Sequence, residues 1–215
     1  MSLSAQDQNR ARFDGIAADW DDNPMRRALA AGVAEAIAAA VPLQADWHAL
    51  EYGCGTGLVG AALAPKLAAL LACDVSPGML AVLEQKAHAA GLDHLHTRVL
   101  DLTSEVPPAE RFELIFSSMT MHHIPDVAAL VRTFHGMLKP GGWLALADLD
   151  TENGSFHGGD AVGVMHQGFD RAALQADLRA AGFSETHART AHTVTKTAAD
   201  GRVNHYPVFL ITARA

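Results

Sequence analysis

The sequence has very few cysteines. Cys54 and Cys73 are the only two in 215 residues, and both fall inside apolar segments with no C-x-x-C spacing. A zinc knuckle and a disulfide framework each need a denser cysteine pattern, so neither is expected. We therefore predict a cytoplasmic protein in a reducing environment.

Positive charge and long apolar runs are also scarce. The chain has 16 Lys and Arg against 24 Asp and Glu, a formal net charge of −8, and no basic run, so nucleic acid is not an expected partner. The longest apolar tract, 28–41, contains Glu35 and stops at Pro42, which is too short and too polar to cross a bilayer. The first ten residues lack the apolar core of a signal peptide. We expect no membrane span.

The length fits one domain spanning residues 1–215. Its first part is helical in character, over Ser4–Trp20 and Pro24–Val41. The break between these helices, D-D-N-P, places Pro24 in a first helical turn. Because both helices precede any strand, residues 1–45 are predicted to form an N-terminal helical cap within the domain.

Short apolar strands then alternate with helices. This rhythm predicts a parallel sheet covered by helices on both faces, which is a Rossmann-like, doubly wound α/β fold. The crossover connections should be right-handed. Strands are expected at 47–52, 69–73, 94–100, 112–117 and 143–147, and helices at 58–67, 77–90 and 126–138.

The last part of the chain departs from this rhythm. A helix at 170–181 is followed by two β-like segments, 185–196 and 206–214. The stretch that joins them has turn residues and no helix, so the two segments should pair as an antiparallel hairpin. The expected sheet is therefore seven-stranded and mostly parallel, with an antiparallel last strand.

A glycine-rich turn, L-E-Y-G-C-G-T-G-L-V-G at 50–60, joins the first expected strand to the next helix. Its last six residues match the G-x-G-x-x-G template of dinucleotide sites, which is a weak signal by itself. A dinucleotide enzyme also needs a second nucleotide-binding half, and little chain follows the fifth strand. A nicotinamide-dependent oxidoreductase is thereby disfavoured but stays an alternative.

Six stretches, in order along the chain, match the motifs of one known family. They are F-D-G-I-A-A-D-W-D (13–21), E-Y-G-C-G-T-G-L (51–58), C-D-V-S-P-G-M-L (73–80), L-D-L (100–102), S-S-M-T-M-H-H-I-P-D (117–126) and L-K-P-G-G-W-L (138–144). Together they resemble the class I S-adenosylmethionine-dependent methyltransferases, particularly the small-molecule branch that includes ubiquinone- and menaquinone-pathway C-methyltransferases. Trp20 stands where the family usually has Tyr, and the likeness weakens after Asp150.

The resemblance implies S-adenosyl-L-methionine as the cofactor and S-adenosyl-L-homocysteine as its product. The glycines and Cys54 would form a close backbone wall, Asp74 would bind the ribose, and Ser117 would lie beside the amino-acid end. Met79 could instead be plain core, and Asp101 a turn cap. The implied cofactor-binding residues are Trp20, Glu51, Gly53, Cys54, Gly55, Gly57, Asp74, Val75, Met79, Asp101, Leu102 and Ser117.

The acidic residues support this cofactor on chemical grounds. Asp74 ends the second strand, where its carboxylate can accept charge-assisted hydrogen bonds from both hydroxyls of a ribose. Dinucleotide enzymes also have an acid at about this distance from their first glycine, so Asp74 alone does not distinguish the two kinds of cofactor. Glu51 and Asp101 add negative charge that disfavours a pyrophosphate and favours a cationic sulfonium.

Four histidines are candidates for the methyl-acceptor side. His122 and His123 follow the fourth strand, and His157 and His166 lie in a Gly/His-rich stretch; ligands in such sheets bind beyond the strand ends. A hydroxyl or carbon acid gains from a general base, for which His is suited near neutral pH. We predict His122 and His166 as catalytic and His123 and His157 as substrate-binding, although 12 histidines leave a bystander role open.

No metal is predicted, because adjacent histidines are a poor ligand pair and no H-x-x-x-H occurs. The predicted enzyme is an S-adenosylmethionine-dependent methyltransferase, EC 2.1.1.-, acting on a small organic acceptor through O, C, N or S. A non-catalytic protein that binds S-adenosylmethionine remains an alternative. The acceptor should be recognised by the N-terminal helices and by residues 151–169, and the oligomeric state, monomer or homodimer, stays open.

Overall fold

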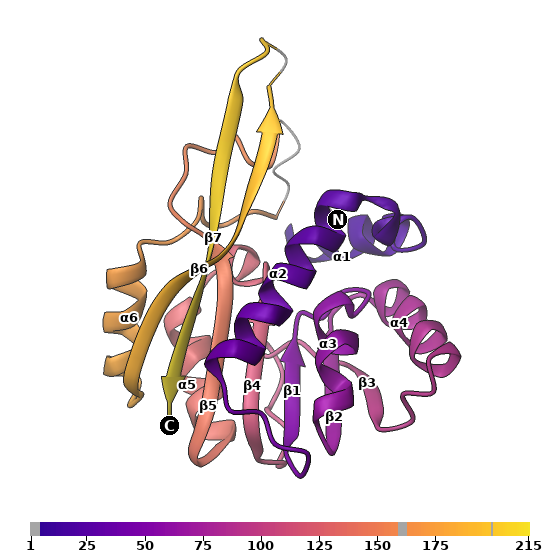
Figure 1. Cartoon of the computed structure of the whole chain (residues 1–215), viewed down its shortest axis with the longest axis vertical. Helices are drawn as coiled ribbons and strands as arrows, with labels where there is room; N and C mark the ends of the chain where they lie inside the picture. Colours follow the sequence, from indigo (N-terminus) through magenta and orange to yellow (C-terminus); the bar gives the residue numbers. More distant parts are fainter. Residues whose placement is uncertain (1–4, 159–162, 199) are drawn as a thin grey trace.

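The computed structural model describes residues 5–158, 163–198 and 200–215. Figure 1 shows one twisted sheet with helices on both faces. Within the described residues the strands are β1 (His48–Tyr52), β2 (Ala69–Asp74), β3 (Leu95–Val99), β4 (Phe112–Ser118), β5 (Leu138–Leu149), β6 (Ser184–Thr197) and β7 (Val203–Arg214). The α-helices are α1 (Ala5–Ile16), α2 (Pro24–Ala40), α3 (Leu58–Leu63), α4 (Pro77–Ala89), α5 (Val127–Met137) and α6 (Arg171–Ala180).

The sheet has the strand order β3-β2-β1-β4-β5-β7-β6. β1 to β5 pair in parallel, and β7 runs antiparallel to both β5 and β6. The predicted seven-stranded, mostly parallel sheet with an antiparallel last strand is confirmed. The strand order reverses between β1 and β4, so their carboxyl ends border the crevice where such sheets bind ligands.

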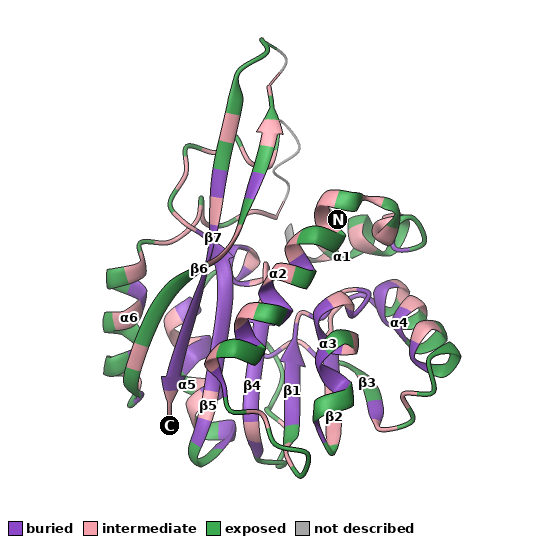
Figure 2. Cartoon of the chain, viewed as in Figure 1, coloured by how far each residue is buried: buried purple, intermediate pink, exposed green. Residues whose placement is uncertain are grey.

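The strand sequences explain how the sheet is covered. Alternate residues along a strand point to opposite faces, and β5 shows this directly: Ala145 and Ala147 pack on the face of α2 and α3, whereas Leu144 and Leu146 pack on that of α5 and α6. Figure 2 shows the central strands as almost wholly buried. Both faces are apolar, which is why the strands read as continuous hydrophobic runs.

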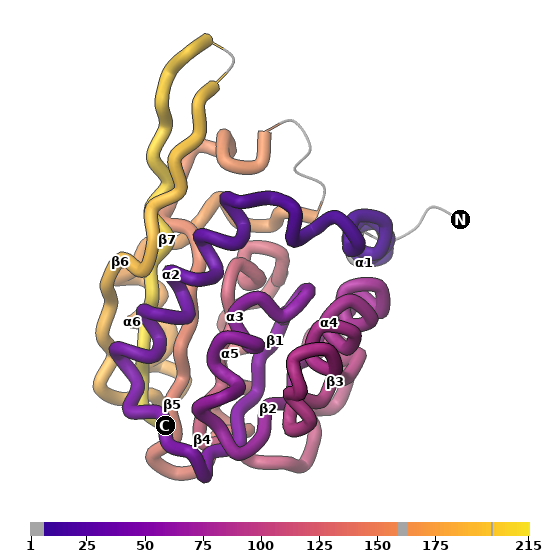
Figure 3. The backbone as a smooth tube through the Cα atoms, turned by 45° about the vertical axis from the view of Figure 1, so that its right-hand side comes forward, coloured from indigo at the N-terminus to yellow at the C-terminus, as the bar shows by residue number. Residues whose placement is uncertain are grey.

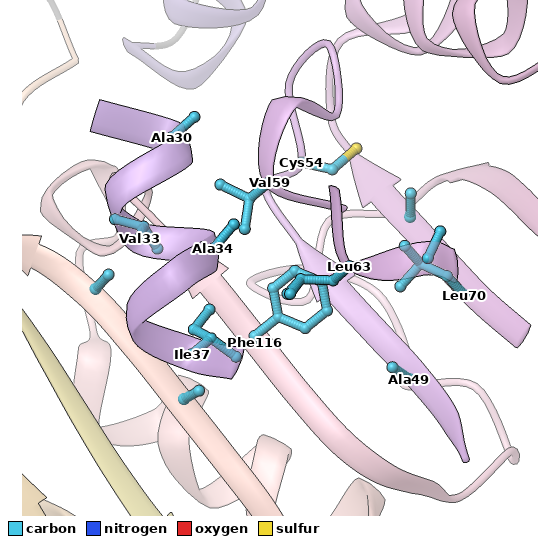
Figure 4. Packing of buried hydrophobic residues seen from close by; sticks show 14 of the residues in the cluster. Ala30, Val33, Ala34, Ile37, Ala49, Cys54, Val59, Leu63, Leu70 and Phe116 are labelled. Carbon is cyan, nitrogen blue, oxygen red and sulfur yellow. The ribbon is translucent and has the colours of Figure 1, made fainter. Parts of the chain in front are cut away.

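The face behind the candidate site is packed by α2 and α3. Figure 4 shows Ile37 of α2 and Leu63 of α3 meeting over Phe116 of β4, and all three side chains are almost fully buried. Asn23 begins α2 by accepting the Met25 N–H at 2.9 Å, as expected of an N-cap followed by Pro. This packing fixes α2 relative to the end of β1.

Several element boundaries differ from the sequence-based expectation, mostly by one residue. The first helix ends at Ile16, and Trp20–Asp22 forms a separate 3-10 turn; the expected start at Ser4 lies outside the described residues. The strand expected at 143–147 begins at Leu138. A register shift opposite Phe112 and Leu114 lets Lys139–Gly142, predicted to close the preceding helix, continue as a bulged strand.

The β6–β7 hairpin is longer than predicted. Figures 1 and 3 show its far end projecting beyond the body of the sheet, on the same side as α1. Pairing continues to Thr197 and Val203; of the connecting turn, residue 199 lies outside the described residues. The hairpin therefore carries side chains such as Val194 and Lys196 to the carboxyl end of the sheet.

Candidate active site

A cavity of about 810 Å³ lies at the carboxyl ends of β1, β2 and β4, which is within the usual range for small-ligand sites. Its walls come from α1, α2, the glycine turn after β1, the loops after β2 to β4, and β6. In Figure 1 the arrow of β1 points toward α1, so the N-terminal cap closes the end of the sheet where the cavity lies.

The glycine turn after β1 needs glycine at two positions for space as well as conformation. Gly53 and Gly57 have φ values of 70° and 74°, in the left-handed region that favours glycine. A Cβ on Gly53 would lie 2.2 Å from Thr120 Oγ1, and one on Gly57 would lie 2.3 Å from Leu83. The turn thus packs against the end of β4 and against α4. Gly57 itself does not border the cavity, whereas Gly53, Cys54 and Gly55 do.

Glu51 is a buried acid with an unused oxygen. Its side chain is 2 % exposed, and its Oε2 has no hydrogen-bond partner among the described residues. Burial raises the pKa of Glu51 to about 8, against a smaller lowering by the Gly60 backbone. A Cβ on Gly60 would lie 2.1 Å from this oxygen, so Gly60 makes room for the carboxyl group.

Asp74 joins the glycine turn to the next loop. One carboxylate oxygen accepts the Gly55 N–H at 2.7 Å and the other accepts the Ser76 N–H at 2.9 Å. Burial raises the pKa of Asp74, while these backbone donors lower it. A carboxylate offers about four lone-pair sites, so Asp74 keeps acceptor capacity toward the cavity. Val75 and Met79 also border the cavity, although the Met79 side chain is nearly fully buried.

Asp101 both borders the cavity and caps a turn. Its carboxylate accepts the Thr103 N–H at 2.9 Å and the Ser104 hydroxyl at 3.0 Å, which is the turn-cap alternative considered above. Leu102 does not border the cavity: its side chain is in the core, and its N–H donates to the Tyr52 hydroxyl at 3.3 Å. The adenine-side role implied for these two residues remains a prediction.

The N-terminal cap is tied to both cofactor-side loops by its two motif acids. Asp14 accepts the Ser76 hydroxyl at 2.6 Å and the Gly78 N–H at 2.9 Å, at the positive end of α4. Asp21 accepts the Thr56 hydroxyl at 2.6 Å and Lys86 Nζ at 2.5 Å. Trp20 lies between these acids and borders the cavity.

The end of β4 contributes Ser118 to the cavity instead of the predicted Ser117. Ser117 is fully buried and donates its hydroxyl to the Tyr52 carbonyl at 2.7 Å. The two serines are adjacent on a strand, so they point to opposite faces, and a one-residue shift decides which of them lines the site. Thr120, which the sequence analysis missed, borders the cavity and donates to the Gly53 carbonyl at 3.1 Å.

A histidine and a buried aspartate form a pair at the cavity wall. His122 lies in a 3-10 turn after β4, and its Nδ1 is 2.7 Å from Asp148 Oδ1. Asp148 is fully buried on β5 and also accepts the backbone N–H of His122 at 3.2 Å. An ionised carboxylate can only accept, so the proton shared by the pair lies on Nδ1, and Nε2 is the ring nitrogen that is not bound to Asp148. The sequence analysis missed Asp148.

Two more histidines surround His122. The ring centroids of His123 and His157 lie 4.2 Å and 4.8 Å from that of His122. Burial, helped by the neighbouring His122, lowers the pKa of both to about 4, so both are neutral at pH 7. His123 Nδ1 is held by the Gly163 carbonyl at 2.8 Å, whereas His157 Nε2 has no partner among the described residues.

His166 lies outside the cavity. Its Nε2 is 2.9 Å from the Ile124 carbonyl, and it borders a separate, smaller hollow beside α5 and α6. Its backbone N–H donates to the His122 carbonyl at 3.1 Å, so it supports the turn that carries His122. Of the stretch 151–169 expected to recognise the acceptor, residues 159–162 lie outside the described residues.

Neither a metal cluster nor a membrane helix is found in the described ranges. They contain no group of three or more His, Cys, Asp and Glu that could hold a metal ion. No helix among them is long and apolar enough to span a membrane.

Comparisons with known proteins agree with the fold and the motifs. A family model described as a methyltransferase domain matches residues 49–142. Ubiquinone biosynthesis O-methyltransferase of Azotobacter vinelandii is 31 % identical over 113 residues, covering 47 % of this chain and 48 % of the relative. The chain spans about half the length of the first curated relatives it matches.

Solved structures extend the likeness to nearly the whole chain. An S-adenosylmethionine dependent methyltransferase from Mesorhizobium loti is 25 % identical with a TM-score of 0.64, covering 84 % of this chain and 96 % of that one. The DhpI–SAH complex is 20 % identical with a TM-score of 0.74, covering 100 % and 98 %. With the ordered motifs and the match over 49–142, these findings show that the chain is similar to S-adenosylmethionine-dependent methyltransferases and has their fold.

Proposed function

We propose that this protein transfers the methyl group of S-adenosylmethionine to a hydroxyl oxygen of a small acceptor, with His122 as the general base. The observation that carries the proposal is the His122–Asp148 pair at the cavity wall. The names of the ubiquinone biosynthesis O-methyltransferases among its relatives support an oxygen acceptor.

The cofactor half of the cavity fits S-adenosylmethionine chemically. The unpartnered oxygen of Glu51 and the carboxylate of Asp101 suit a ligand that carries an ammonium and a sulfonium but no phosphate. Asp74 would bind the ribose hydroxyls, and the backbone of Gly53 and Gly55 allows close approach. Bound S-adenosylmethionine supplies an electrophilic methyl group.

The residues of the chain then act on the acceptor. Asp148 holds the tautomer of His122 that leaves Nε2 unprotonated, and it stabilises the imidazolium once that nitrogen takes the acceptor proton. Neutral His123 and His157 add no positive charge that would oppose this step. Trp20 and Phe13, which make an edge contact at 5.7 Å, exclude water from the side covered by the cap.

Binding and turnover are tested separately. Calorimetry should show binding of S-adenosylmethionine and S-adenosylhomocysteine, with no binding of NADH. Turnover with phenols, catechols and hydroxy acids should exceed turnover with amines, and His122→Asn should abolish proton-assisted transfer to oxygen without weakening cofactor binding. NADH binding in place of S-adenosylhomocysteine would support the oxidoreductase alternative, and cofactor binding without product across the panel would support the non-catalytic one.

A further inference from the structure

Three cations line one part of the cavity, in a chain whose net charge is −8. Arg12 of α1, Arg26 of α2 and Lys196 of β6 border it. They come from three segments that are far apart in the sequence, so the fold gathers them. Arg10 also borders the cavity but pairs with Asp7 at 3.3 Å.

None of these three cations forms an ion pair within the described ranges. Arg26 donates to the Trp20 carbonyl at 3.2 Å and lies 3.7 Å from the centre of the Trp20 ring. Lys196 donates to the Phe156 carbonyl at 2.6 Å and lies 3.7 Å from the Phe156 ring centre. Arg12 is exposed and forms no ion pair with a carboxylate of the described residues. Guanidinium and ammonium groups have five and three donors, so most of their donors stay free.

The cations are close enough to repel one another. After burial, the nearby Arg12 is the main cause that lowers the pKa of Arg26, and Arg26 in turn lowers that of Lys196. Two acids act against this lowering: Asp21 raises the pKa of Arg26, and Glu152 raises that of Lys196. Asp21 is engaged by Thr56 and Lys86. Glu152 accepts the Phe156 N–H at 3.1 Å through one oxygen, whereas its Oε1 has no hydrogen-bond partner among the described residues. An anion beside the three cations would relieve the repulsion.

The cavity wall is also aromatic and carries unused polar atoms. Phe13 packs edge-on against His123 at 5.5 Å, and Phe156 packs edge-on against His157 at 4.9 Å. The buried atoms Asn9 Oδ1 and His157 Nε2 have no partner among the described residues, and both residues border the cavity. A flat ligand with polar substituents would meet these groups.

We propose that the methyl acceptor is an anionic hydroxy-aromatic compound whose carboxylate, phosphate or phosphonate group binds Arg12, Arg26 and Lys196. The inference rests on the proposed function, because it names the substrate class of the same site. The cationic cofactor and the anionic acceptor would then occupy different parts of the cavity, each facing charges of the opposite sign, with His122 between them. Arginine suits such groups because its fork of donors matches paired oxygens.

Three probes of one shape test the charge requirement: 4-hydroxybenzoate, 4-hydroxyphenylphosphonate and the neutral 4-hydroxybenzamide. Binding is measured by calorimetry to the protein loaded with S-adenosylhomocysteine, so turnover is not needed. Both acids should bind at least about tenfold more tightly than the amide. A stronger preference for the phosphonate identifies a phosphoryl group as the natural anion, and the reverse identifies a carboxylate.

The variants Arg12→Gln and Lys196→Gln remove one charge each while keeping most of the side-chain length. Each should weaken binding of the acids by roughly tenfold and leave binding of the amide unchanged. Lys66→Gln is the matched control, because Lys66 is exposed and outside the cavity. Arg12 is exposed, so this variant stays informative even if Lys196→Gln fails to fold.

The outcomes separate the inference from the proposed function. Acids that bind preferentially, and lose this preference in the variants, support the inference even if no methylated product appears. Equal binding of the acids and the amide, or an effect of Lys66→Gln as large as that of Arg12→Gln, overturns it. Methylation of all three probes with equal efficiency leaves the methyltransferase proposal intact and rejects the anionic acceptor.

Discussion

The two halves of the cavity are built in different ways. The cofactor half is formed by residues that closely follow β1, β2 and β3, so Glu51, Asp74 and Asp101 are visible as motifs in the sequence. The acceptor half is assembled from α1, α2, the turn after β4, the loop after β5, and the β6–β7 hairpin. The difference shows that a constant cofactor can be encoded locally, whereas acceptor recognition depends on which distant segments the fold brings together.

The largest effect should come from the acceptor half. His122→Asn removes the proposed base, and because general base catalysis typically contributes 10² to 10⁴-fold, kcat should fall by roughly that factor. The dissociation constant of S-adenosylhomocysteine should stay the same, which separates the two halves. His96→Asn, at an exposed position on β3, is the control for loss of a histidine. An equal loss of cofactor affinity in His122→Asn would mean that the halves are not independent.

Substitutions in the glycine turn should show that the cofactor half also contributes to the stability of the fold. Gly53→Ala combines a left-handed backbone with a clash against Thr120, and we expect a loss of about 3 kcal/mol in the free energy of unfolding. Gly55→Ala has the same backbone region, with φ of 52°, but open space for its Cβ. Its loss should be nearer 1 kcal/mol. Urea unfolding measures both, and equal losses would contradict the packing argument.

The raised pKa of Glu51 predicts a pH dependence of stability that arises in the cofactor half of the cavity. Its pKa is about 8 when folded and 4.5 in its ordinary state, so the folded protein retains a proton that the unfolded chain releases between these values. The contribution of Glu51 to the free energy of unfolding is therefore fully present below pH 4.5 and is lost as the pH rises to 8. The loss should be on the order of 3 kcal/mol.

The measurement compares wild type with Glu51→Gln by urea unfolding at pH 5 and pH 8, without cofactor. The substitution should remove the decline in unfolding free energy between pH 5 and pH 8. The variant should therefore gain stability relative to wild type at pH 8. His123 and His157 act in the opposite direction, since their lowered pKa values make stability rise with pH between about 4 and 6.5. The difference between the two proteins cancels that contribution. An identical pH dependence in both would refute the buried, protonated Glu51.

The smallest effect should come from Asp74. Asp74→Asn keeps one acceptor oxygen but removes the charge, and charge-assisted hydrogen bonds contribute about 2 kcal/mol. We therefore expect S-adenosylhomocysteine to bind about 30-fold more weakly, with kcat at saturating cofactor little changed. Glu35→Gln, at an exposed position of α2, controls for the loss of an acid. A fall in kcat at saturation would place Asp74 in the acceptor half as well.

The sequence alone determined the sheet, its strand directions and most of the cofactor half. These follow from short-range signals: apolar runs with turn residues between them predict the strands, and the glycines and acids lie within a few residues of strand ends. The sequence pointed to Ser117 as a cavity residue, but Ser118 borders the cavity instead. A shift of one residue along a strand moves a side chain to the opposite face of the sheet. The sequence also counted Leu102 among the cofactor residues, although its side chain points into the core.

Only the tertiary structure decided the acceptor half. Asp148 reads in the sequence as one more residue of a buried strand, and its role appears only where β5 lies beside the turn that carries His122. The same holds for Arg12, Arg26 and Lys196, which come from opposite ends of the chain and meet because the cap and the hairpin project over the same end of the sheet. His166, predicted as catalytic from its neighbourhood in the sequence, instead bonds to the Ile124 carbonyl outside the cavity. Contacts between distant segments depend on packing directions that no local pattern encodes.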